Sequence, residues 1–120
     1  MSLPEKVSIT AVVDNYIDVF EPSTPLVERA VPGKLKKPLL AGHGLAYLVD
    51  ISQGENTFCL LMDTGNAFEP LKHNLEALGR TPNEVDALLL SHGHPDHYGG
   101  LLGFLEWRGT PLPIYCHPDV

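Results

Sequence analysis

The chain has 120 residues and a mass of 13.1 kDa, which suits one domain and leaves little room for two. Apolar residues make up 43% and charged residues 19%, a balance that favours a packed core over a disordered chain. The net charge of −7 argues against a surface that neutralises nucleic-acid phosphates, and no apolar run reaches the length of about 18 residues that a membrane helix needs.

The cysteines and the N-terminus predict the compartment. Cys59 and Cys116 are too few for a disulfide framework, and their spacing matches no metal knuckle. The first residues, 1–6, contain no apolar segment of the kind found in signal peptides. We therefore expect a cytoplasmic protein with a small-molecule substrate and with neither a nucleic acid nor a membrane as its partner.

Alternating apolar residues predict three strands in the first half of the chain, over 7–13, 45–51 and 57–62. The last two strands are joined by the short, turn-rich segment 52–56, as in a β-hairpin. Residues 18–42 hold several prolines and no clear periodicity, so we expect a long loop there. The lysines of this loop, at 34, 36 and 37, are either solvated or placed to meet an acidic substrate.

The second half predicts helices alternating with strands. Apolar residues at helical spacing predict a helix over 68–78, and Thr81–Glu84 has the pattern of a capping box. A buried strand is expected at 87–91, a loop at 92–97, a helix at 98–107 and a fifth strand beginning at 113–116. This order predicts an α/β fold, an open mixed sheet with helices packed on it. We expect the domain to continue past Val120, because the helix that should follow the fifth strand is absent.

The segment from His92 to His97 carries the predicted chemistry. His92 and His94, two residues apart in an extended segment, project to the same side, and imidazole nitrogens bind zinc at about 2.0–2.1 Å. Asp96 and His97 add a carboxylate and a third imidazole, enough for two adjacent ions that activate a bridging water. The strand over 87–91 runs directly into this segment, as strands do before ligand loops in open α/β sheets. The alternative is a polar loop whose histidines cap the next helix.

The motif and its flanking residues resemble those of a known family. Residues 91–100, Ser-His-Gly-His-Pro-Asp-His-Tyr-Gly-Gly, are similar to the HxHxDH metal motif of the metallo-β-lactamase-fold hydrolases. Leu61–Gly65 resembles that superfamily's strand that ends in an Asp-x-Gly turn. Val13–Asn15 and Gly42–Leu45 are similar to a narrower group, the proteins akin to 7,8-dihydropterin-6-methyl-4-(β-D-ribofuranosyl)aminobenzene-5′-phosphate synthase. The resemblance covers nearly the whole chain but only the first half of the family's fold.

The resemblance implies an αββα sandwich, of which residues 1–120 form the N-terminal portion. It implies that His92 and His94 bind one metal ion and that Asp96 and His97 bind a second, with a His, a bridging Asp and a final His supplied by the second half. We expect the two ions to be zinc, with iron or manganese as alternatives. The resemblance implies that Asp63 orients a metal ligand; capping of the following helix is the alternative, and the two roles are compatible.

The predicted function is that of a metal-dependent hydrolase acting on an ester or phosphoester through a water activated by two ions. Asp96 would bind metal and orient the nucleophile as the catalytic residue. Two alternatives stay open: a pterin-phosphate synthase-like transferase, and a non-catalytic metal-binding or interaction domain. If residues 1–120 are the whole chain, an uncovered sheet face predicts a homo-oligomer. Outside the motif, His43 and Asn15 are expected in turns, and His117 at the end of a strand.

Overall fold

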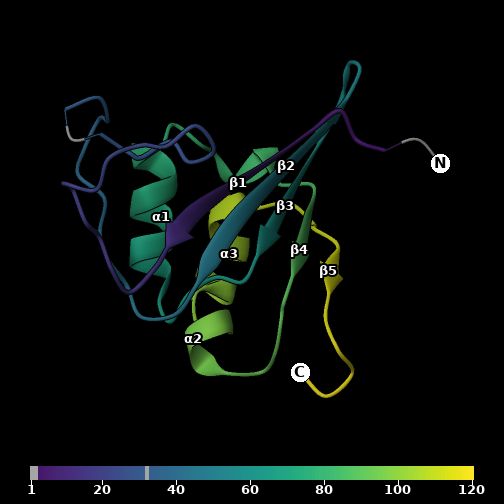
Figure 1. The fold of residues 1–120 in the computed structure, drawn as a ribbon. Coiled ribbons are helices and arrows are strands. Elements are labelled where there is room, and N and C mark those ends of the chain that lie inside the picture. The colour runs from purple at the N-terminus through teal and green to yellow at the C-terminus, as the bar shows by residue number, and fades with distance from the viewer. Residues whose placement is uncertain (1–2, 32) are drawn as a thin grey trace.

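The computed structural model describes residues 3–31 and 33–120, which form one mixed sheet with helices packed against it (Figure 1). The five strands lie in the order β1-β2-β3-β4-β5, antiparallel across the first three and parallel from β3 to β5. The predicted α/β fold, a mixed sheet with helices, is confirmed. In chain order the elements are β1 (Lys6–Val13), β2 (Ala46–Gln53), β3 (Asn56–Met62), α1 (Phe68–Ala77), a 3₁₀ helix (Pro82–Glu84), β4 (Ala87–Leu89), α2 (Pro95–Tyr98), α3 (Leu101–Arg108) and β5 (Ile114–Tyr115).

One face of the sheet packs on helices α1 and α3 and forms the core. Side chains alternate between the two faces of a strand, so Leu48 of β2 lies opposite Leu61 of β3 on the same face. Both leucines are fully buried, together with Leu71 of α1 and Phe104 of α3. Phe104 has no exposed surface, and its burial fixes α3 under the strands that lead to the motif.

The other face of the sheet is apolar and uncovered among the described residues. Its side chains come in three rows across β1, β2 and β3, in which Val7 pairs with Ile51 and Ile9 pairs with Val49. Ile9 is 69% exposed and Phe58 is 43% exposed, so the strands carry apolar side chains into solvent. The face is formed by Val7, Ile9, Ala11, Tyr47, Val49, Ile51, Phe58, Leu60 and Met62.

Helix α2 was not predicted, and α3 is shorter than the helix expected at 98–107. The chain turns helical already at Pro95, within the predicted loop, and restarts as α3 at Leu101. The break falls at Gly99 and Gly100, where a Cβ would lie 2.1 Å from the Asn66 carbonyl oxygen and 2.5 Å from that of Thr64, respectively. Only glycine permits this close approach of two backbones at the junction of the two helices.

The connection between β1 and β2 contains turns and bends but no helix or strand in its described residues, with Pro32 lying outside them. Its end is anchored to α1 by the buried Asn74, whose amide nitrogen donates to the carbonyls of Val12 at 2.7 Å and Leu40 at 2.8 Å. Lys37, one of the three loop lysines, pairs with Glu76 at 2.7 Å. Over the described ranges of the chain, every helix is too short or too polar to cross a membrane.

We expect residues 1–120 to associate in solution through the uncovered sheet face, because burying large exposed apolar patches is favourable. Replacing Ile9 and Phe58 together by Lys places two charges on that face and should shift the sedimentation profile toward the monomer. Leu102→Lys changes an apolar side chain of α3 that is 73% exposed and serves as the control. A wild-type chain that sediments as a monomer at tens of micromolar would contradict the expectation.

Candidate metal centre

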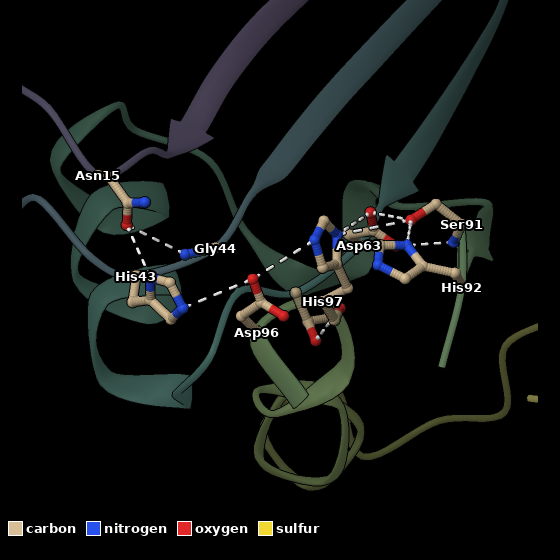
Figure 2. A network of polar contacts seen from close by, with 9 residues as sticks. Asn15, His43, Gly44, Asp63, Ser91, His92, Asp96 and His97 are labelled. Atoms are coloured by element: carbon tan, nitrogen blue, oxygen red, sulfur yellow. Dashed lines mark hydrogen bonds and ion pairs between the residues drawn. The ribbon is translucent and has the colours of Figure 1, made fainter. Parts of the chain in front are cut away.

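The motif lies in the connection that follows β4, at the carboxyl end of the parallel strands. Its imidazole rings gather: the centroids of His92 and His94 are 4.5 Å apart, and those of His92 and His97 are 4.0 Å apart. Figure 2 shows His97 between Asp96 on one side and Asp63, Ser91 and His92 on the other. The three motif histidines, which the sequence spacing predicts to lie together, are thus close to one another in the structure.

Asp63, at the end of β3, is the buried anchor of this cluster. Its carboxylate accepts three hydrogen bonds: from the backbone N–H of Ser91 at 2.8 Å, from the Ser91 hydroxyl at 2.6 Å and from Nδ1 of His97 at 2.8 Å. Only 2% of the residue is exposed. It does not cap the next helix, because the residue before α1 is Ala67, which has no side-chain cap. Of the two expected roles, the structure shows the contact with a motif histidine.

The turn from Asp63 to Asn66 also holds the motif by its backbone. The N–H of Thr64 donates to the His97 carbonyl at 2.8 Å, and the N–H of Gly65 donates to the Leu45 carbonyl at 2.9 Å. Asp63 itself takes a left-handed conformation with φ of 58°, which Asp tolerates better than most residues. The turn thus joins the start of β2, the end of β3 and helix α2.

A second polar group reaches the motif from the segment before β2. Oδ2 of Asp96 lies 3.6 Å from Nε2 of His43, and Nδ1 of His43 lies 3.3 Å from Oδ1 of Asn15 (Figure 2). The N–H of Gly44 donates to the same Asn15 oxygen at 3.2 Å. Gly44 has φ of 93°, and a Cβ there would lie 1.7 Å from the Asp96 carbonyl oxygen. His43 and Gly44 lie in a bend rather than in the expected turn, and this bend brings His43 to the edge of the motif.

The donor set suits zinc, although within residues 3–31 and 33–120 no three His, Cys, Asp or Glu side chains are already arranged around one ion position. Oδ2 of Asp96 and Nε2 of His97 are 3.6 Å apart, too far for a hydrogen bond. Two donors that share one ion at about 2.0–2.1 Å in a tetrahedral site are separated by roughly 3.4 Å. His97 also has its other nitrogen held by a buried carboxylate, the usual support of a metal-binding imidazole.

The remaining histidines and cysteines take other roles in the structure. Nε2 of His73 lies 2.7 Å from the Pro38 carbonyl, and His117 is an exposed residue that faces Asp119 at 3.4 Å. Cys59 belongs to the core, where burial, first of all, raises the pKa of its thiol to about 12. A thiol with that pKa stays protonated at neutral pH and is a poor metal ligand.

Sequence reasoning missed one contributor altogether, Ser91. Its hydroxyl lies 2.6 Å from Asp63 and 2.9 Å from Nδ1 of His92. The available signal was a polar residue ending a buried strand immediately before the first motif histidine. Its partner Asp63 is 28 positions away in the sequence, so this contact had no local pattern.

A sequence model of the metallo-beta-lactamase superfamily matches residues 39–117, which include Asp63 and the whole motif. The chain belongs to this superfamily. The matched range contains both β3, which Asp63 follows, and the histidine loop after β4.

Two curated relatives of this superfamily member differ in their named activities. It is 34% identical over 83 residues to a 7,8-dihydropterin-6-methyl-4-(beta-D-ribofuranosyl)-aminobenzene-5′-phosphate synthase of Methanocaldococcus jannaschii, covering 69% of this chain and 28% of the relative. It is 40% identical over 69 residues to a hydroxyacylglutathione hydrolase of Serratia proteamaculans, covering 58% of this chain and 24% of the relative. The chain spans about a quarter of the length of these relatives.

Among solved structures, a mutant flavo di-iron protein from Thermotoga maritima is 29% identical with a TM-score of 0.47, over 59% of this chain and 17% of that one. A metallo-β-lactamase with a HARLDQ motif from Cronobacter sakazakii is 26% identical with a TM-score of 0.42, over 56% of this chain and 24% of that one.

We expect Asp63→Asn to lower the free energy of unfolding of the metal-free protein by about 1–3 kcal/mol, because its amide N–H₂ cannot accept from the Ser91 hydroxyl and the His97 N–H. Asn is chosen because it tolerates the left-handed backbone at this position. Denaturant unfolding in the presence of a chelator measures the change. Asp119→Asn, at a side chain that is 88% exposed, is the control, and equal unfolding curves for all three proteins would refute the anchoring role.

Proposed function

We propose that this superfamily member is a metal-dependent hydrolase whose substrate is a small molecule with an ester or phosphoester bond. The observation that supports the proposal is the gathering of His92, Asp96 and His97 beside one buried carboxylate, Asp63. Two imidazoles and a carboxylate lie close together here, and one imidazole is hydrogen-bonded to a buried carboxylate. This arrangement favours the binding of a divalent cation over a purely structural role for the loop.

The motif residues have distinct roles in this proposal. His92 and His94 would hold one ion, and Asp96 and His97 a second, as the resemblance to the family implies. A divalent metal bound there supplies an acidified water and polarises the scissile bond, with zinc expected first and iron or manganese as alternatives. Asp96, whose side chain is 27% exposed, also reaches the solvent side, where it can orient the attacking water.

A pterin-phosphate synthase-like transferase is the second candidate. The 34% identity to the Methanocaldococcus enzyme over 83 residues favours it, whereas the 40% identity to a hydroxyacylglutathione hydrolase favours hydrolysis. The two are separated by assaying ester hydrolysis against transfer to a pterin acceptor. We assign either activity to the cytoplasm, in keeping with the free thiols of Cys59 and Cys116.

The metal assignment predicts that replacing His92 and His94 together by Ala abolishes most of the bound metal. The purified protein is loaded with Zn²⁺, freed of excess by gel filtration and measured by elemental analysis. His73→Ala is the matched control, since this histidine lies on α1 and contacts the Pro38 carbonyl instead. Unchanged stoichiometry in the double variant would refute the assignment.

The catalytic assignment predicts that turnover depends on Asp96 and on more ligands than one loop supplies. With Zn²⁺ or Mn²⁺ and chromogenic ester and phosphodiester substrates, residues 1–120 alone should show little turnover. Where the reading frame extends beyond Val120, the longer product should be active, and Asp96→Asn should reduce its kcat by about 100-fold or more, since even the groups that merely support metal ligands contribute about 10–100-fold. Asp119→Asn should leave the rate unchanged. Equal activity of the two lengths would show that a partner chain or a residue outside the motif completes the site.

A further inference from the structure

We infer that Ser91 sets the tautomer of His92, which leaves Nε2 of this imidazole as the nitrogen that is free to bind a metal ion. The inference rests on the proposed function, because it gives a role to a residue beside a proposed ligand. Ser91 is thereby a positioning residue, acting through His92 and touching neither metal nor substrate.

The direction of each hydrogen bond follows from the chemistry of the groups. An ionised carboxylate only accepts, so the single hydrogen of the Ser91 hydroxyl is donated to Asp63 Oδ2 at 2.6 Å. The Ser91 oxygen is then left as an acceptor for Nδ1 of His92 at 2.9 Å. Nδ1 must therefore carry the proton, and in a neutral ring Nε2 keeps its lone pair.

The same carboxylate oxygen controls a second ring without an intermediary. Nδ1 of His97 lies 2.8 Å from Asp63 Oδ2, against 3.5 Å from the Ser91 hydroxyl, so its proton is donated to Asp63. One buried carboxylate thus fixes two imidazoles in the same protonation pattern, His97 directly and His92 through a hydroxyl. Neutral histidine in water favours the opposite pattern, with the proton on Nε2, so this hydrogen-bond chain reverses the intrinsic preference.

The hydroxyl can be removed without removing the backbone anchor. The N–H of Ser91 donates separately to Asp63 Oδ1 at 2.8 Å, and this bond survives in Ser91→Ala. Ser91→Thr retains the hydroxyl and is the conservative variant. Ser52→Ala, on β2, removes a hydroxyl away from the motif and is the matched control.

The tautomer is measured directly in the metal-free protein. Long-range ¹H–¹⁵N correlation spectra of the imidazole rings, recorded at a pH where the rings are neutral, distinguish Nδ1–H from Nε2–H. We expect Nδ1–H at His92 in the wild type, in Ser91→Thr and in Ser52→Ala, and mainly Nε2–H in Ser91→Ala. His97 should keep Nδ1–H in all four, since its partner is Asp63. A His92 ring that stays Nδ1–H in Ser91→Ala would overturn the inference.

Metal affinity gives the second measurement. Competition with a chromophoric chelator should show Zn²⁺ binding about 10–100-fold weaker in Ser91→Ala, and within about 3-fold of the wild type in Ser91→Thr and Ser52→Ala. A merely structural role would instead lower the thermal midpoint of the metal-free protein and leave the His92 tautomer unchanged. If the Zn²⁺ affinity is unchanged in Ser91→Ala but metal is lost in the His92 and His94 double variant, the inference about Ser91 is wrong and the proposed function stands. Metal retained in the double variant would overturn the proposed function, whatever the tautomer spectra show.

Discussion

A buried carboxylate is tolerated only when its oxygens are satisfied, and this requirement organises the end of the sheet around Asp63. Desolvating an ionised carboxylate costs several kcal/mol unless hydrogen bonds and charge compensate it. Here a backbone N–H, a hydroxyl and an imidazole meet that requirement, and two of these three partners belong to Ser91. The stability of the fold and the orientation of the motif thus depend on the same bonds.

Close backbone packing explains why the motif is held in one position. Gly44 lies against the Asp96 carbonyl on one side, and Gly99 and Gly100 lie against the turn that follows Asp63 on the other. Any side chain at these glycines would push the motif helix α2 away from β3 and from the start of β2. The hydrogen bond from the N–H of Thr64 to the His97 carbonyl also joins this turn to α2. Together these contacts hold α2 between the segment at Gly44 and the turn that follows Asp63.

The sequence predicted the features that depend on the spacing of residues within one segment. It did not predict the features that depend on contacts between residues far apart in the sequence. The strands, the helix beginning at Phe68 and the capping box at Thr81 follow from spacing that a single segment contains. The sequence predicts one helix over 98–107, because the contacts of Gly99 and Gly100 with residues more than thirty positions earlier leave no local pattern. Ser91 likewise read as the last residue of a strand, because nothing near it in the sequence reveals Asp63 as its partner. The histidine motif was visible because its four polar residues are contiguous.

Solvent exposure increases along one path of the polar network, which runs from Asp63 through His97 and Asp96 to His43. The side chain of Asp63 is 3% exposed, that of His97 14%, that of Asp96 27% and that of His43 67%. Electrostatic interactions are strongest where water is excluded, so the bonds of Asp63 fix the geometry of the inner imidazoles most firmly. The outer groups keep contact with solvent. His43 lies at the exposed end of this path, with its Nδ1 facing Asn15 and its Nε2 facing Asp96. One continuous series of polar contacts therefore joins the buried carboxylate of Asp63 to the exposed imidazole of His43.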